Sequence, residues 1–395
     1  MSMILAAFVN MVFNVDNMND PIGIVVMNNL SMSLIQKNNG LCNCLLFMAM
    51  LFLVACDSSS EFGGNSLVSS RTKVDVQGDG TTLAAIRQRG HIRCGVSTSL
   101  PGFSAPDSQG NWSGLDVDFC RVLSAAIFAD PTRIVFIPLN AKERFDALQA
   151  GEIDILSRNT SWTYTRDIPQ HLNFVGITFY DGQGFLVRRD AAINTPEDLN
   201  GAAICVKGNT TSEQNLVAYF RQRNMIYQPV IFDTSDQSLS GFEAGRCSAL
   251  SADRSALASM RLNLKNPGSA VLLPMVISKE PLGPVIREGD NQWHKITRWT
   301  FFAILNAEEF GITSENIDGF KHSNNPMISR LMGEEDSLGQ NLGLDDLWAY
   351  HAVKLVGNYG EIFERNLGMN SPIKISRGVN NLWTNGGLQY GPPLR

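Results

Sequence analysis

Apolar and polar positions alternate from about residue 81 onward in a pattern that predicts strands followed by helices. The runs HIRCGVS (91–97) and RIVFIPL (133–139) are apolar enough for buried strands, and GLDVDFCRVLSAAIF (114–128) has apolar residues at helical spacing. KERFDALQAGEIDILS (142–157) then predicts a helix, a glycine stop and a strand. Strands that alternate with helices favour an α/β fold with a largely parallel sheet.

The same order of elements returns after residue 200. AAICVKG (202–208) and PVIFD (229–233) predict strands on either side of the helix TSEQNLVAYFRQRN (211–224). RFDALQAGEIDILSRN (144–159) and SLSGFEAGRCSALSAD (238–253) both run helix, Ala-Gly, charged residue, apolar strand and polar turn. This echo indicates two lobes that are built alike, although chance similarity between two such units is common in α/β proteins.

Two segments have the character of crossovers between these lobes. FYDGQGFLVRRD (179–190) lies between the two repeats, and the Pro-rich PMVISKEPLGPVIRE (274–288) follows the second. The chain would leave the first lobe near Arg188 and return near Pro281. A long tail follows, and the aromatic residues that recur in it at helical spacing are expected to be core residues.

The pattern of the N-terminal part predicts an export signal. LCNCLLFMAMLFLVAC (41–56) is apolar but shorter than a typical membrane span, and Lys37 supplies a positive flank. Small residues before Cys56 resemble the bacterial lipobox, in which this cysteine becomes the lipidated first residue of the mature protein. The alternatives are a plain export signal or a membrane anchor with a chance cysteine. The polar and acidic start upstream of the signal indicates an over-extended translation start.

The polar, Ser- and Gly-rich stretch after Cys56 has no periodicity and predicts a flexible tether. The whole division is then 1–31 as a candidate over-extended N-terminus, 32–55 as a lipoprotein signal peptide, 56–80 as a tether, 81–187 with 281–395 as a discontinuous first lobe with a C-terminal helical extension, and 188–280 as the second lobe.

Composition supports a globular two-domain protein. The chain has 395 residues, 44% hydrophobic and 18% charged residues, and a formal net charge of -6. Lysines and arginines are scattered without a basic stripe, so nucleic acid is not expected as a partner. Once the signal cysteines and Cys56 are set aside, four cysteines remain in an oxidising compartment, and they allow three disulfide pairings or four free buried thiols. These are Cys94, Cys120, Cys205 and Cys247.

Metal ligands are not expected, since no cysteine has metal-ligand spacing and the histidines lie far apart in sequence.

Residues 157–167, SRNTSWTYTRD, place neutral hydrogen-bonding groups after a predicted strand and end near one cation, Arg166. In parallel α/β lobes, ligands lie beyond the carboxyl ends of strands. The planar guanidinium of Arg166 suits a carboxylate, which it can hold through two parallel hydrogen bonds. Asn159, Thr160 and Ser161 supply further hydrogen-bonding groups nearby. A surface ion pair is the alternative for this arginine.

Two further turns mark the second lobe. VKGNTTSEQN leads from a strand into a helix, and Thr210 with Glu213 has capping-box spacing. The free N–H groups of a helix start at Thr210 and Thr211 attract anions, and an ordinary helix cap is the alternative. In ALSADRSAL, Asp253 follows a strand and could hold an ammonium group, although alone it also fits a helix cap.

A cation and an anion on opposite lobes match a zwitterionic amino acid, with its carboxylate on Arg166 and its amine on Asp253. Leu100 and Phe103, in the loop STSLPGFSAPD, would lie against the ligand's side chain, although Phe103 fits the core equally well. No Gly-x-Ser-x-Gly elbow occurs, and these turns contain no histidine base. Asp116 is expected only to favour a helix dipole. Binding without catalysis and without a cofactor is therefore expected.

Several long segments resemble one known family in order, from about Thr81 to the C-terminus. They are CGVSTSLPGFSAPDSQGNWSGLDVDFC, LSRNTSWTYTRD, NFVGITFYDGQGFLV, and VGNYGEIFERNLG with the later SPIKISRGVNNLWTNGGLQYGPP. The family is that of the bacterial extracellular solute-binding proteins (family 3), which deliver polar amino acids to ABC transporters, and the general L-amino-acid-binding branch in particular. The resemblance implies a two-lobed, type II periplasmic-binding-protein-like fold with the ligand cleft between the lobes.

The resemblance also implies roles for individual residues. Arg166 would bind the α-carboxylate and Asp253 the α-amine. Thr210 and Thr211 match the hydroxyl pair that opens the second-lobe helix, and Ser161 matches a hydrogen-bonding position.

Two positions depart from the family's usual pattern. Asn159 stands where related proteins often have serine. Leu100 stands where many members carry an aromatic residue that stacks on the ligand, and this departure fits a permissive pocket.

The expected function is that of an extracytoplasmic binding protein which captures L-amino acids of broad range by lobe closure and delivers them to an ABC permease in the inner membrane. The protein is expected to be a monomer in the periplasm, anchored by lipid at the inner membrane because Asp57 follows Cys56. A dehydratase-like periplasmic enzyme on the same fold and a ligand-sensing module are the rivals. The sensing module would need a downstream membrane helix, and the chain ends at GPPLR without one.

Overall fold

The computed structural model describes residues 79–395, which contain two main sheets. The first is formed by β1 (Ile92–Ser97), β4 (Ile134–Leu139), β5 (Ile155–Ser161), β6 (Leu172–Phe174), β7 (Phe179–Asp181) and β13 (Glu280–Arg287). Its order is β4-β1-β5-β13-β6, and β7 also pairs with β13. β1 is parallel to β4 and β5, whereas β13 runs antiparallel to β5, β6 and β7.

The second sheet repeats this plan. It is formed by β8 (Gln183–Arg188), β9 (Ala203–Lys207), β10 (Gln228–Phe232), β11 (Ala249–Asp253) and β12 (Ala270–Leu272). Its order is β10-β9-β11-β8-β12, with β9 parallel to β10 and β11, and β8 antiparallel to β11 and β12. β5 and β11 therefore hold the same place in the two sheets. Each follows a helix and an Ala-Gly pair whose glycine has a positive φ, 72° at Gly151 and 73° at Gly245, so the predicted echo is confirmed.

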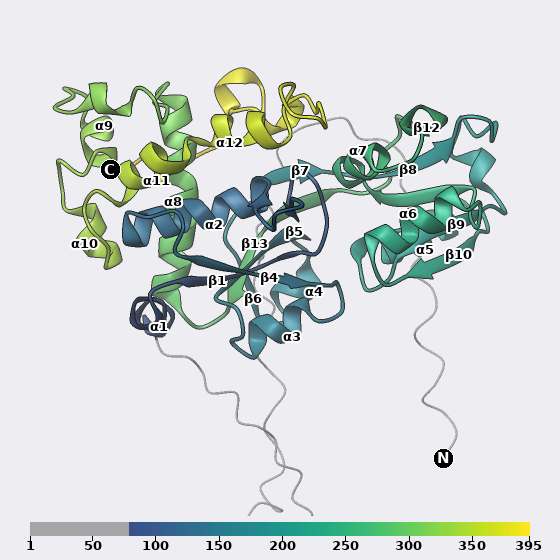
Figure 1. Cartoon of the computed structure of the whole chain (residues 1–395), viewed down its shortest axis with the longest axis horizontal. Coiled ribbons are helices and arrows are strands. Elements are labelled where there is room, and N and C mark those ends of the chain that lie inside the picture. The colour runs from purple at the N-terminus through teal and green to yellow at the C-terminus, as the bar shows by residue number, and fades with distance from the viewer. Residues whose placement is uncertain (1–78) are drawn as a thin grey trace, which may run out of the picture. The chain divides into compact units, whose positions relative to one another are not determined.

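Helices surround both sheets, as Figure 1 shows. They are α1 (Thr81–Arg89), α2 (Leu115–Phe128), α3 (Arg144–Gln149), α4 (Tyr164–Asp167), α5 (Thr211–Gln222), α6 (Ser235–Glu243), α7 (Arg254–Leu262), α8 (Asn291–Glu309), α9 (Pro326–Leu331), α10 (Leu338–Leu342), α11 (Trp348–Val356) and α12 (Tyr359–Asn366). A small hairpin joins β2 (Ala105–Pro106) to β3 (Trp112–Ser113). Trp293, Trp348 and Phe363 of the tail helices are buried in the core of the first lobe, which confirms the prediction for these three aromatic residues.

Two crossovers connect the sheets. β7 ends at Asp181 and β8 begins at Gln183, so only Gly182 separates a strand of the first sheet from a strand of the second. The expected exit near Arg188 is therefore corrected, because β8 already pairs with β11 in the second sheet. A Cβ atom on Gly182 would lie 2.3 Å from Cγ1 of Val276, in the return crossover. Residues 179–188 form one nearly continuous extended segment, so the sequence gives no local sign of the boundary at Gly182. The absence of a side chain at Gly182 lets the two crossovers pack closely against each other.

One disulfide lies in each lobe. Cys94 of β1 is joined to Cys120 of α2, and Cys205 of β9 is joined to Cys247, just before β11. The structure thus has one of the three possible pairings and no free thiol among these four residues. The predictions for Cys56, the signal peptide, the first segment and nearly all of the tether lie outside the described residues. No helix within residues 79–395 has the length and apolar character needed to cross a membrane.

Candidate functional site

A cavity lies where the carboxyl ends of β5 and β11 face each other, and residues of both sheets line it. The lining consists of Leu100, Arg144, Arg158, Asn159, Ser161, Arg166, Lys207, Thr210, Thr211, Ser212, Ser235, Ser238, Ser251, Ala252, Asp253, Ala256 and Met260. All but two of the binding residues predicted from the sequence are among them. The position agrees with the expectation that ligands bind beyond the carboxyl ends of parallel strands.

Phe103 and Thr160 are the two predicted residues that do not line the cavity. Phe103 is 1% exposed and packs edge-on against Phe179, with ring centroids 5.4 Å apart, so it belongs to the core. The loop folds back on itself through a bridge between Leu100 and Ser104, which leaves Leu100 at the cavity wall and turns Phe103 inward. The Thr160 hydroxyl is fully buried and donates to the Arg158 carbonyl oxygen at 3.1 Å.

Arg166 is held by the short helix α4 and is only 7% exposed. Its Nη1 donates to the Ser161 carbonyl oxygen at 2.7 Å, and its guanidinium lies 5.4 Å from the centre of the Phe145 ring. Burial lowers the pKa of Arg166, and the nearby Glu280 and Asp253 partly offset this effect. The surface ion pair considered as an alternative is not found, since this guanidinium is buried and takes part in no ion pair among residues 79–395.

Asp253 ends β11 and faces the cavity with 8% of its surface exposed. Although it stands at the N-cap position of α7, its side chain makes no capping hydrogen bond. Its Oδ2 instead accepts a long hydrogen bond of 3.4 Å from the Asn159 side chain. Burial, and then repulsion from Asp181 and Glu280, raises the pKa of Asp253 to about 8. Lys207 and Arg166 favour the ionised form of this carboxyl group, but their effect is smaller.

The two threonines at the start of α5 have different partners. The Thr210 hydroxyl donates to the Lys207 carbonyl oxygen at 2.7 Å and accepts from the Glu213 backbone N–H at 3.4 Å, so it is a helix cap. The Thr211 hydroxyl donates to Oε2 of Glu280 at 2.9 Å. Thr210, Thr211 and Ser212 at this helix start all line the cavity, and the first N–H groups of a helix have no partner within the helix.

Glu280, which the sequence analysis missed, joins groups of both lobes. It is 1% exposed at the start of β13. Its Oε2 accepts from the hydroxyl groups of Ser161, at the end of β5, and Thr211, and its Oε1 accepts from Asn215 of α5 at 2.6 Å and Ser278 at 2.7 Å. Because Ser161 and Thr211 donate their hydroxyl protons to Glu280, their oxygens can only accept hydrogen bonds from a ligand.

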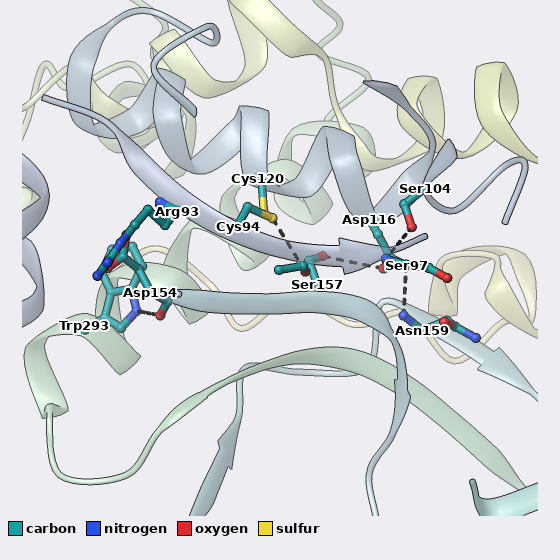
Figure 2. The surroundings of a disulfide bond; sticks show 11 residues. Arg93, Cys94, Ser97, Ser104, Asp116, Cys120, Asp154, Ser157, Asn159 and Trp293 are labelled. Atoms are coloured by element: carbon teal, nitrogen blue, oxygen red, sulfur yellow. Dashed lines mark hydrogen bonds and ion pairs between the residues drawn. A yellow bond between two sulfur atoms is a disulfide. The ribbon is translucent and has the colours of Figure 1, made fainter. Parts of the chain in front are cut away.

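Asn159 has a left-handed backbone with φ of 35°, a conformation that asparagine tolerates better than most residues. Its backbone N–H donates to the buried Asp116 carboxylate at 2.8 Å, and the Ser157 hydroxyl donates to the same carboxylate at 3.5 Å. Figure 2 shows this arrangement beside the disulfide between Cys94 and Cys120. Asp116 lies in the first turn of α2, as its expected dipole role requires, but it also holds the strand that carries the site.

Three cavity cations were also missed. Arg144 lies at the start of α3, Arg158 in β5, and Lys207 at the end of β9. Arg144 and Arg158 are each 3% exposed. The signal that could have found Lys207 is its place at the carboxyl end of an apolar strand. No cluster of three or more His, Cys, Asp or Glu side chains able to hold a metal ion occurs between residues 79 and 395.

Comparison with known proteins agrees with this architecture. Residues 92–315 match the model of the bacterial extracellular solute-binding proteins, family 3. The chain is 53% identical over 317 residues to the general L-amino acid-binding periplasmic protein of Rhizobium johnstonii, covering 80% of this chain and 93% of that protein. It is 45% identical over 316 residues to a glutamate/glutamine/aspartate/asparagine-binding protein of Rhodobacter capsulatus, covering 80% of this chain and 94% of that protein.

A solved structure shares the fold. It is the periplasmic binding protein of an ABC transporter from Brucella ovis with glutathione bound, 50% identical with a TM-score of 0.79, and the match covers 81% of this chain and all of that one. The expected type II periplasmic-binding-protein fold is thereby confirmed. The chain belongs to the bacterial extracellular solute-binding proteins of family 3.

Proposed function

We propose that this protein captures an L-amino acid in the cavity between its two sheets and delivers it to the permease of an ABC transporter. The observation that carries the proposal is that Arg166 of α4 and Asp253 at the end of β11 line one cavity, are both buried, and lack an ion-pair partner within residues 79–395. A buried guanidinium without an ion-pair partner is costly, and a ligand carboxylate would pair with it. A ligand ammonium group would in turn favour the ionised form of Asp253.

The hydrogen-bonding groups between these two residues support the same orientation of the ligand. The hydroxyl oxygens of Ser161 and Thr211 are acceptors, as is Oδ1 of Asn159, which is buried without a partner in the described part of the chain. Three acceptors in the cavity that Asp253 also lines suit an ammonium group. The guanidinium of Arg166 and the N–H groups at the start of α5 suit the carboxylate.

Capture would proceed by closure of the two lobes about the crossovers at Gly182 and before β13. Each lobe supplies part of the site, so the ligand would favour the closed state through contacts that exist only there. Names of three relatives support this role, since they describe amino-acid-binding proteins, one of them explicitly of an ABC transporter.

Calorimetric titration tests the proposal. The purified protein is unfolded and refolded to remove carried ligand, then titrated with a panel of L-amino acids, and each ligand is recovered to show that it is unchanged. Arg166→Ala should weaken binding by at least about 100-fold, since a charged hydrogen-bonded pair is worth about 3 kcal/mol or more. The exposed Arg133→Ala is the control and should bind normally. Unchanged affinity in Arg166→Ala, or a chemically altered ligand, would refute the proposal.

We also propose that Cys56 carries a lipid that anchors the protein to the periplasmic face of the inner membrane, where it acts as a monomer. The support is the sequence LVAC at the end of an apolar run, followed by Asp57. Cys56→Ala should move the protein from the membrane fraction to the soluble periplasmic fraction. A variant that stays in the membrane fraction would contradict lipid anchoring.

A further inference from the structure

The cavity wall has a marked excess of positive charge. Its ionisable residues are Arg144, Arg158, Arg166, Lys207 and Asp253, so four cations face one acid. A bound zwitterion would add one negative and one positive charge, which pair with Arg166 and Asp253. Arg144, Arg158 and Lys207 would then face neither a second acid of the cavity wall nor a second negative charge among the ligand's backbone groups.

Arg144 and Lys207 have only neutral hydrogen-bond partners in the described part of the chain. Nη1 of Arg144 makes a long hydrogen bond of 3.5 Å to the Thr160 hydroxyl, and its Nε is buried without any partner. Nζ of Lys207 donates to the Ser235 hydroxyl at 3.2 Å. An arginine that is 3% exposed and incompletely bonded at a cavity wall is a group prepared for a ligand.

Arg158 differs from Arg144 and Lys207 because the buried acid Asp116 lies close enough to attract it electrostatically. Its Nε donates to the Leu139 carbonyl oxygen at 2.9 Å. Arg158 thus serves mainly to raise the positive potential of the wall. The effect is visible on Lys207, because burial and then repulsion from Arg158 and Arg144 lower the pKa of Lys207 to about 7. Cations that repel one another in a buried wall are stabilised when an anion enters.

We propose that Arg144 and Lys207, supported by Arg158, form a second anion-binding subsite, so that the preferred ligands are L-amino acids with a carboxylate on the side chain. This inference rests on the proposed function. Leu100 and Met260 of the same wall supply apolar surface for the alkyl part of such a side chain. The subsite selects by charge, whereas Arg166 and Asp253 recognise the groups that all amino acids share.

Three ligands of nearly equal shape separate charge from size. L-Glutamate, L-glutamine and L-norvaline have side chains of similar length that end in a carboxylate, an amide and a methyl group. Titration of the refolded protein at pH 6.5 should show L-glutamate binding at least about tenfold tighter than L-glutamine, with L-norvaline weakest. Lys207→Met and Arg144→Gln, made separately, should each reduce the preference for L-glutamate over L-glutamine at least about fivefold and change L-glutamine affinity much less.

Matched controls test whether these effects come from the subsite. Lys142→Met removes an exposed lysine two residues from Arg144 and should leave the preference unchanged. Thermal unfolding of the Lys207→Met and Arg144→Gln proteins without ligand should occur at no lower temperature than for the wild type, since each change removes repulsion between cations.

The outcomes distinguish the inference from the proposed function. If L-glutamine and L-norvaline bind the wild-type protein as tightly as L-glutamate, the subsite is wrong while amino-acid capture stands. If both variants weaken all three ligands equally, Arg144 and Lys207 act on the shared groups of the ligand and the inference is also wrong. If none of the three ligands nor any other L-amino acid binds, both proposals fall.

Discussion

Affinity for a neutral amino acid should rise as the pH increases from about 6 to about 8. Burial and the neighbouring Asp181 and Glu280 raise the pKa of Asp253 to about 8, while Lys207 and Arg166 act in the opposite direction with less effect. The unliganded carboxyl group is therefore mostly protonated at neutral pH. To hold the ligand's ammonium group it must lose this proton, and a bound ammonium favours the ionised form.

The size of the effect follows from the linkage between protonation and binding. Each pH unit below the pKa costs about 1.36 kcal/mol, so at pH 6 deprotonation of a group with a pKa of about 8 costs about 2.7 kcal/mol. Binding at pH 6 should then be about 100-fold weaker than binding to the fully ionised site. The logarithm of the association constant should rise by nearly one for each pH unit below 7 and level off above 8, with release of about one proton per ligand bound.

Calorimetry between pH 6 and 8 measures both quantities. L-Norvaline is the suitable ligand because it has no side-chain charge to interact with Lys207, and buffers of different ionisation enthalpy report the number of protons released. Asp181→Asn removes a neighbouring acid, so it should lower the pKa of Asp253 and move the midpoint of the profile to lower pH. Affinity that is independent of pH in this range, or proton uptake on binding, would refute the assignment of the ammonium group to Asp253.

Two further predictions concern residues behind the cavity wall. Glu280→Gln should weaken amino-acid binding about 30-fold, or about 2 kcal/mol, because an amide cannot accept all the hydrogen bonds from Ser161, Thr211 and Asn215. Titration beside the exposed control Glu288→Gln checks this, and equal affinities in the two variants would contradict it. Replacing both Cys94 and Cys120 by serine should lower the free energy of unfolding by about 3 kcal/mol, because the disulfide closes a loop with a sequence separation of 26 residues. Denaturant unfolding measures this loss, and a change below about 1 kcal/mol would show that the crosslink contributes little.

The helices and strands, and the two residues assigned to the ligand's charged groups, were predictable because their sequence signals are local. Arg166 and Asp253 each follow an apolar strand in a polar turn, and the rule that ligands bind at the carboxyl ends of parallel strands brings the two turns together. The echo between residues 144–159 and 238–253 likewise needs only short-range periodicity, and it correctly places β5 and β11 at equivalent positions.

What sequence reasoning missed depends on contacts between distant segments. Glu280 meets Ser161 across 119 positions of sequence, and its own surroundings, a Pro-rich extended segment, give no local reason to expect a buried carboxylate. Arg144 resembles any charged residue at a helix start until α3 is packed against β5 and the side chain is buried. Phe103 shows the opposite case, since a bridge between Leu100 and Ser104 decides which side of the loop faces the ligand.

Gly182 offers a means of adjusting affinity without altering any group that contacts the ligand. A methyl group there would meet Cγ1 of Val276 at 2.3 Å and the Ser278 carbonyl oxygen at 2.9 Å, so alanine would wedge the two crossovers apart at the hinge. No residue that lines the cavity would be replaced, but the equilibrium between open and closed forms would shift, and the apparent affinity would change by the same factor as the closed fraction. The strength with which this protein would retain its ligand is therefore set in part by the absence of one methyl group at Gly182, a residue that does not itself line the cavity.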